Sequence, residues 1–114
     1  MPYLKIQTNQ TLDETAQQSL LKKASATVAE LLGKPENYVM VALQPAQTML
    51  FAGTDGPLAY LELKSIGLPE AATKDLSDSL CTLMAQALNI EKNRIYIEFT
   101  DAPRHMWGWD GGTF

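Results

Sequence analysis

The residue of this sequence most suggestive of catalytic chemistry is Pro2, which follows Met1. Methionine is usually removed when the next residue is small, and its removal would leave Pro2 with a free secondary amine. An unperturbed terminal amine titrates near pH ~7.7–8.0, and a low dielectric favours its neutral form. Such an amine can act as a base near neutral pH. The alternative is that Pro2 is only a rigid first residue of a strand, and Pro2 alone does not separate the two.

The residues that follow have the pattern of a strand, a helix and a second strand. Apolar and polar residues alternate over 3–8, which predicts a half-buried strand. Thr11-x-x-Glu14 has the form of a capping box, and apolar residues at three- and four-residue spacing then predict a helix that ends at Gly33. A second strand is expected over 38–43.

The second half of the chain repeats this plan. A strand is expected over 58–66, a helix from Pro69 to Asn89, and a closing strand over 94–99. Equivalent positions in the two halves keep one constant separation, which indicates a repeated β-α-β unit. The pairs that share it are Leu20 with Leu76, Leu32 with Leu88, and Asn37 with Asn93.

Two such units predict an α+β, two-layer fold in which a four-stranded mixed sheet carries both helices on one face. We expect a single domain over 1–114, with repeats over about 2–44 and 58–100 and a tail over 101–114. The second and fourth strands have apolar residues on both faces, which predicts a cover on the open face of the sheet, most simply another subunit. The aromatic tail is expected to dock, for example along a neighbour's sheet edge.

Composition argues against several classes of function. The net charge of −4 and the lack of a basic patch argue against nucleic-acid binding. The apolar runs are far shorter than the ~18 residues that span a membrane, and no signal-peptide pattern is visible. A cytoplasmic location is therefore expected, with non-classical secretion left open. Cys81 is the single cysteine, so the chain has no intramolecular disulfide. With His105 as the single histidine, the two residues cannot build a typical zinc site.

Several motifs together resemble the macrophage migration inhibitory factor family of the tautomerase superfamily. The resemblance runs from residue 2 to residue 114, and its aromatic ending distinguishes this family from the dopachrome-tautomerase branch. The motifs are Met1-Pro2 at the start of a strand, Gly33-Lys34-Pro35 before Tyr38, Ser65-Ile66-Gly67, Arg94-Ile95-Tyr96-Ile97, and Gly108-Trp109 with Thr113-Phe114.

The resemblance implies a homotrimer with an active site at each subunit interface and with neither cofactor nor metal. The implied reaction is the keto–enol tautomerisation of small aromatic α-keto acids such as phenylpyruvate, with dopachrome-like compounds as weaker substrates. The implied site residues are Pro2 as catalytic base, Lys34 and Ile66 as substrate contacts, Tyr96 from the neighbouring subunit, and Trp109 and Phe114 as pocket walls.

These residue types suit that chemistry. Moving a proton next to a carbonyl needs a base, a stabiliser for the enolate and an apolar slot for the ring. Lys34 would hold the substrate's carboxylate or enolate, and its charge would lower the pKa of the Pro2 amine. The alternative role for Lys34 is that of a cation at a helix C-terminus.

Two residues in the implied pocket depart from the family pattern. Glu98 stands where animal members have an asparagine that contacts the far end of the substrate ring, so it adds negative charge and offers no donor. Trp107 replaces a smaller aliphatic residue at the pocket mouth. We therefore predict weak activity toward an anionic keto acid. Leu58 and Leu61 replace the CxxC of some relatives, which argues against their proposed thiol oxidoreductase activity.

Two classes of function stay open at this point. One is an isomerase, favoured because Pro2, Lys34, Ile66 and Tyr96 occur together. The other is a signalling or binding protein that keeps the fold with little catalysis, since animal relatives act as cytokines through a receptor.

Overall fold

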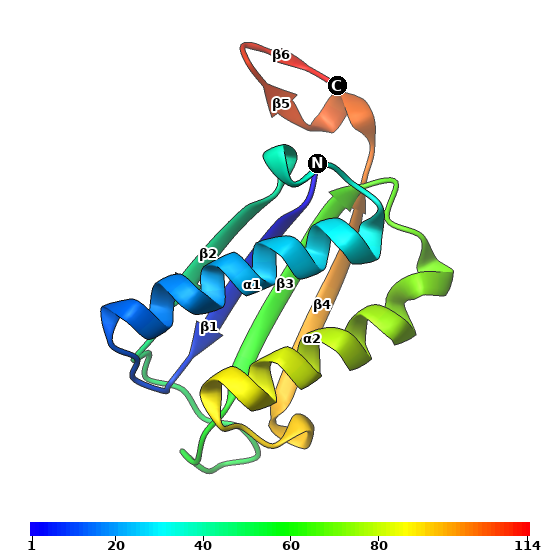
Figure 1. Cartoon of the computed structure of the whole chain (residues 1–114). Helices are drawn as coiled ribbons and strands as arrows, with labels where there is room; N and C mark the ends of the chain where they lie inside the picture. Colours follow the sequence, from blue (N-terminus) through cyan, green and yellow to red (C-terminus); the bar gives the residue numbers. More distant parts are fainter.

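The protein has two layers, a four-stranded mixed sheet and two helices that cover one of its faces (Figure 1). The structure is a computed structural model and describes residues 1–114. The elements are β1 (Tyr3–Thr8), α1 (Glu14–Leu32), β2 (Met40–Gln44), β3 (Ala59–Ile66), α2 (Thr73–Leu88), β4 (Ile95–Ala102), β5 (Gly108–Trp109) and β6 (Gly112–Thr113).

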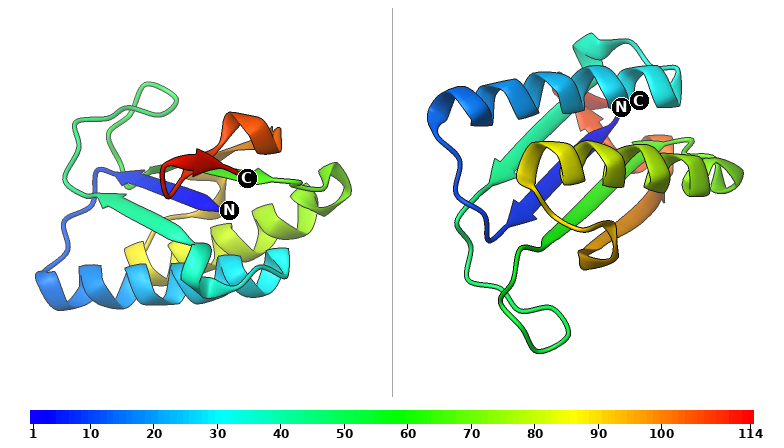
Figure 2. Two further views of the ribbon diagram at one scale, coloured as in Figure 1. Left: turned by 90° about the horizontal axis from the view of Figure 1, so that it is seen from above. Right: turned by 60° about the horizontal axis from the view of Figure 1, so that its bottom comes forward.

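The sheet has the order β2-β1-β3-β4, so β1 and β3 are its central strands. The outer strands β2 and β4 run parallel to their inner neighbours β1 and β3, and the two inner strands are antiparallel. Two β-α-β units lie side by side with both helices on the same face, as predicted. The two chain termini lie close together in both views of Figure 2.

The hydrophobic core lies between the sheet and the helices. Every second residue of the central strands points into it, because strand side chains alternate between faces. Burying each such leucine or isoleucine contributes about 1.5–3 kcal/mol. The core residues of the four main elements include Leu4 and Ile6, Leu61 and Leu63, Leu20, Ala24 and Val28, and Leu76, Leu80 and Met84. Cys81 is buried among them, as expected of a small hydrophobe.

The start of α1 differs from the sequence prediction. Asp13 is the N-cap, and its Oδ1 accepts a 2.8 Å hydrogen bond from the Ala16 backbone N–H. The predicted capping box at Thr11 is therefore wrong. The physical reason is that the helix begins at Glu14, so the residue directly before it makes the cap, and the Asp13 carboxylate also complements the helix dipole. Gly33 ends the helix at φ 61°, as predicted.

Other boundaries are shifted by short 3-10 turns. One turn, Glu36–Tyr38, delays β2 until Met40, whereas a strand was expected from residue 38. A second turn, Glu70–Ala72, follows Pro69 and delays α2 until Thr73. β4 is longer than predicted and runs to Ala102.

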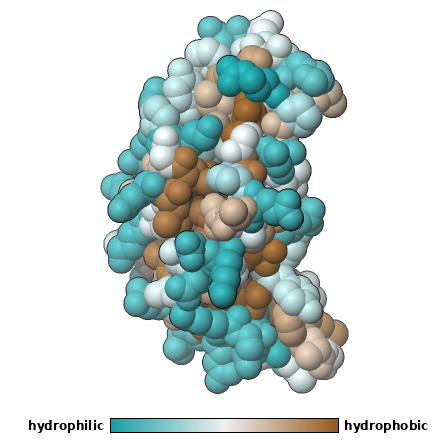
Figure 3. Space-filling model, turned by 90° about the vertical axis from the view of Figure 1, so that its right-hand side faces the viewer, coloured by the Kyte–Doolittle hydropathy of each residue, from teal (hydrophilic) through white to brown (hydrophobic).

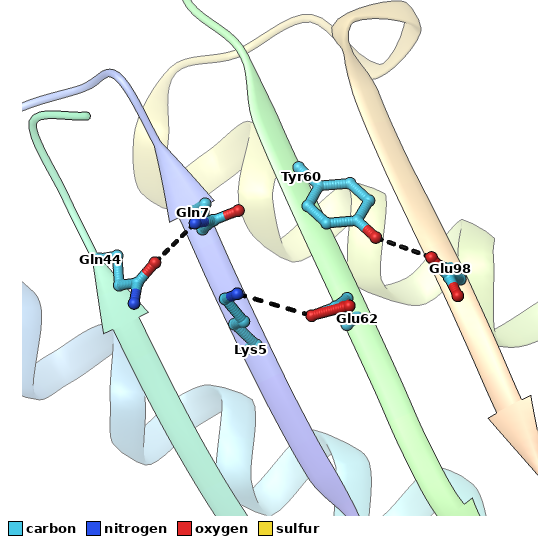
Figure 4. A network of polar contacts seen from close by, with 6 residues as sticks. All are labelled: Lys5, Gln7, Gln44, Tyr60, Glu62 and Glu98. Atoms are coloured by element: carbon cyan, nitrogen blue, oxygen red, sulfur yellow. Dashed lines mark hydrogen bonds and ion pairs between the residues drawn. The ribbon is translucent and has the colours of Figure 1, made fainter. Parts of the chain in front are cut away.

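The open face of the sheet is mixed: polar links join its strands, and exposed apolar side chains stand on both outer strands, Met40 on β2 and Tyr96 on β4. Side chains that point away from the helices form links between each pair of neighbouring strands (Figure 4). The polar groups of such cross-strand pairs find their partners within the sheet itself. The links are Gln7 to Gln44 at 2.6 Å, Lys5 to Glu62 at 3.7 Å, and the Tyr60 hydroxyl to Glu98 at 2.8 Å. That another subunit covers this face stays a prediction.

The C-terminal tail forms its own hairpin, β5 with β6, beyond the end of the sheet that carries the N-terminus (Figure 1). Asp110 and Gly111 form its turn with φ values of 51° and 77°, the conformation that an Asp-Gly hairpin turn requires. Within one chain the tail therefore pairs with itself, and its docking on a neighbour stays a prediction. No helix of the protein combines the length and apolarity that crossing a membrane requires.

The cap of α1 gives a direct test of this part of the fold. We expect Asp13→Ala to lower the free energy of unfolding by about 1 kcal/mol, because the Ala16 N–H loses its acceptor. Thr11→Ala, the matched control, should change it by less than about 0.5 kcal/mol. Urea denaturation of both variants measures this, and equal losses would show that Asp13 is not the cap.

Candidate active site

The head of β1 encloses Pro2. Its side chain is fully buried, and its carbonyl oxygen accepts a 3.0 Å hydrogen bond from the Met40 N–H. Proline has no N–H to give to the sheet, so its nitrogen is left out of the ladder. While Met1 is attached this nitrogen is an amide and has no basicity. A free Pro2 amine at this position would be held in one place by the sheet itself.

A hollow of about 510 Å³ opens at this end of the sheet. Its lining combines the N-terminus, the start of β1 and β2, the end of β3 and the tail hairpin. The lining includes the side chains of Pro2, Lys64, Tyr38, Trp107, Trp109 and Phe114. The hollow therefore offers a mainly aromatic wall with one cation.

Three aromatic rings hold the tail against the end of the sheet. Trp109 and Phe114 stack at 5.4 Å with their planes 16° apart. Tyr38 meets both edge-on, at 5.7 Å and 6.2 Å between ring centres. The Phe114 N–H also donates to the Trp107 carbonyl at 3.3 Å. Aromatic pairs of this kind add about 0.5–1.5 kcal/mol each, so these contacts stabilise the hairpin against Tyr38.

The electrostatic environment favours a neutral amine at the N-terminus. Burial lowers the pKa of the Met1 amine below its usual value, and the charges of Lys34 and then Arg104 lower it further. The end of α1 fixes the backbone of Lys34, because the Lys34 N–H donates to the Ala29 carbonyl at 3.0 Å. A planar anion with an apolar ring would match these cations and this aromatic wall.

Comparison with known proteins shows the family of this chain. The family model described as Macrophage migration inhibitory factor (MIF) matches residues 1–114. The chain belongs to the MIF family. A macrophage migration inhibitory factor homolog of Brugia malayi is 41% identical over 115 residues, which cover 100% of this chain and 99% of that protein.

Solved MIF structures share the fold. The crystal structure of a macrophage migration inhibitory factor homologue from Prochlorococcus marinus is 44% identical, with a TM-score of 0.93 and 98% of each chain covered. The macrophage migration inhibitory factor of Trichinella spiralis is 33% identical, with a TM-score of 0.90, and covers 98% of this chain and 99% of that one. These findings confirm the family and the fold predicted from the sequence.

The structure brings one group of the residues implied by the MIF resemblance together. Pro2, Trp107, Trp109 and Phe114 line the same hollow, and the charge of Lys34 acts on the amine beside it. Ile66 does not line the hollow. It is 7% exposed at the end of β3, two residues beyond the residue that pairs with Tyr3, and so lies at the same end of the sheet.

The other two residues, Tyr96 and Glu98, lie elsewhere in the chain. Tyr96 pairs with Tyr60, which pairs with Gln7. It is therefore about 16 Å along the strands from Pro2 and about 10 Å across them. Glu98 lies on the open face, where it accepts the hydrogen bond from Tyr60. One chain alone does not gather the full set.

Sequence reasoning missed three residues near the N-terminus. Lys64 and Tyr38 line the hollow, and Arg104 acts on the pKa of the terminal amine. Lys64 could have been found from strand alternation only with the β1–β3 register in hand, since it faces Tyr3. Arg104 had no comparable signal, because a 3-10 turn in the tail places it.

The charges near the N-terminus lead to a prediction about the pKa of the terminal amine. Lys34→Ala should raise the pKa of the terminal amine, because a repelling positive charge is removed, but the pKa should stay below its usual value because burial remains. Arg104→Ala should raise it less. Lys92→Ala is the control, since Lys92 pairs with Asp78 and is not among the causes of the shift. NMR titration of the ¹⁵N-labelled amine measures these values, and an unchanged pKa in Lys34→Ala would contradict the assignment.

Proposed function

We propose that this protein is a phenylpyruvate-type keto–enol tautomerase that uses the Pro2 amine, freed by removal of Met1, as general acid and base. The observation that carries the proposal is one juxtaposition: the buried Pro2 at the head of β1, two cations acting on the Met1 amine directly before it, and an aromatic hollow that opens beside both. The MIF family, to which the chain belongs, supports the same reaction class.

The reaction is a proton transfer that one amine can complete. In the direction from enol to keto acid, neutral Pro2 removes the proton of the enol hydroxyl, and its N–H⁺ then delivers a proton to the benzylic carbon. The O–H and C=C bonds are replaced by C=O and C–H, with no net oxidation. The amine must be neutral at the start. Burial and Lys34 favour the neutral form of the Met1 amine, and we expect them to act in the same way on a freed Pro2 amine.

The remaining residues would bind the substrate. Lys34 would attract the carboxylate or the developing enolate, and Lys64 adds a second cation to the hollow. The rings of Trp109 and Phe114 offer an apolar surface for the substrate ring. Trp107 lines the same hollow and adds bulk, in keeping with the weak activity expected from the sequence.

We further propose a homotrimer with sites between subunits, because the site residues of one chain lie at opposite ends of its sheet. Tyr96 is 65% exposed and packs on Phe51, next to Leu50, which is 70% exposed. Exposed apolar residues gathered in this way mark contact surfaces. The side that carries β4 and α2 also shows a broken apolar band between polar areas (Figure 3).

In such an assembly, Tyr96 and Glu98 of one subunit would complete the Pro2 site of another. Glu98 would present a carboxylate already bonded to the Tyr60 hydroxyl. That bond raises the pKa of Tyr60 to about 12, so Tyr60 stays a donor at neutral pH. Glu98 therefore keeps its acceptor character, and an anionic substrate would meet a negative group there.

The catalytic proposal predicts the effect of losing Pro2. In protein whose intact mass shows that Met1 is absent, wild type should accelerate the loss of enol absorbance of phenylpyruvate. Pro2→Gly should lower kcat/KM by about 10²-fold or more, because general acid–base catalysis contributes that much. Protein that retains Met1 is the matched control and should be inactive. If processed wild type is inactive, or Pro2→Gly equals it, the proposal fails and a signalling or binding role becomes the better interpretation.

The assembly proposal predicts a trimer at micromolar concentration. Light scattering should report about three times the chain mass of 12.6 kDa. Leu50→Asp should shift the distribution toward smaller species, because it puts a charge in the exposed apolar cluster. A stable 12.6 kDa monomer of wild type would contradict both the trimer and the interfacial site.

A further inference from the structure

The proposed reaction does not use a second cluster at the opposite end of the sheet. It consists of Arg94, which directly precedes β4, and the loop over 49–58 between β2 and β3, here called the 49–58 loop. The Arg94 guanidinium donates to four backbone carbonyls of this loop. The acceptors are those of Pro57 at 2.9 Å, Thr54 at 3.2 Å, and Phe51 and Gly56 at 3.3 Å.

These bonds attach the 49–58 loop to the start of β4. Asn9 adds a second attachment, donating to the Asp55 and Gly56 carbonyls and accepting from the Leu58 N–H. The tip of the loop is a strained turn, since Ala52 has φ 54° without being glycine. A planar fork of five N–H donors can hold such a set of carbonyls, and a lysine ammonium cannot reproduce it.

Arg94 also leads directly to a residue of the proposed site. Its guanidinium carbon lies 5.4 Å from the centre of the Phe51 ring, and Phe51 lies 4.7 Å from the Tyr96 ring at 51°. The three side chains form one stack in the order Arg94, Phe51, Tyr96. Phe51 and Tyr96 also line an all-apolar hollow of about 410 Å³ with Leu58. The exposed Tyr96 ring is therefore oriented by a neighbour that Arg94 fixes.

We propose that Arg94 is a positioning residue for Tyr96. It holds the 49–58 loop and Phe51 so that Tyr96 meets a neighbouring subunit's substrate in one orientation. This inference rests on the proposed function, in which Tyr96 contacts substrate. A side chain held in its bound orientation loses less entropy on binding, so the benefit falls on substrate affinity. Pro2 of the same chain lies at the opposite end of the sheet, and none of the three side chains is the base, so the change affects how Tyr96 contacts substrate and leaves the base unchanged.

The test uses processed, full-length protein with phenylpyruvate as the probe. Arg94→Lys keeps the charge and removes the fork, and we expect KM to rise about five- to tenfold while kcat and the acid limb of the pH–rate profile stay within about twofold. Phe51→Leu should raise KM to a similar extent, and the double variant should be no worse than either alone, because both act through one stack. Lys92→Ala, two residues away, should match wild type.

A second readout does not depend on activity. NMR signals of the Tyr96 ring should shift and broaden in Arg94→Lys and in Phe51→Leu, with the oligomeric mass unchanged, but not in Lys92→Ala. Unchanged ring signals, or a loss of kcat that follows a loss of assembly, would overturn the positioning role. If wild type is inactive, the proposed function fails instead, and the ring signals still decide whether Arg94 orders Tyr96.

Discussion

The placement of β1 as a central strand is the constraint on which the site depends. Because β2 and β3 pair with it on both sides, the first residue of the strand is enclosed rather than free at an edge. The Pro2 carbonyl is tied to Met40, and its ring is buried. A chain terminus is normally mobile and solvated. Here the sheet holds Pro2 in a desolvated position, and burial is also the first cause of the lowered pKa of the Met1 amine before it.

The same topology separates the residues of the proposed site. The two central strands are antiparallel, so the head of β1 and the start of β4 lie at opposite ends of the sheet. Each chain thus presents an aromatic hollow at one end and an exposed tyrosine on an apolar cluster at the other. Polar links join the strands on the open face, and Tyr96 stands exposed at its outer strand. Contact between one chain's tyrosine end and another's hollow would use the apolar surfaces that remain.

Much of this fold was predictable from local pattern. Alternation in 3–8 and the apolar stripes fixed the strands and helices, and Gly33 and Asn89 were recognised as helix ends, with φ of 61° and 55° in the structure. What local pattern lacked was register. The Tyr60–Glu98 bond and the place of Lys64 follow from which residues pair across strands, which no single segment encodes. The cap at Asp13 was missed because two capping residues stood two positions apart, and only the helix start distinguishes them.

The candidate site likewise combines residues that the sequence predicted with residues that only the structure places there. The family resemblance supplied Pro2, Lys34 and the tail aromatics, and the hollow joins most of them. The effect of Arg104 and the proposed role of Arg94 depend on contacts between distant segments, which no local pattern predicts, although Arg94 stands in a motif of the resemblance. The most direct measurement is a paired one on Met1-free protein: the pKa of the ¹⁵N-labelled Pro2 amine by NMR, and the acid-limb pKa of kcat/KM for phenylpyruvate. We predict that the two values coincide below the usual pKa of a terminal amine. An amine pKa at or above that usual value, or one that differs from the kinetic pKa, would contradict Pro2 as the base.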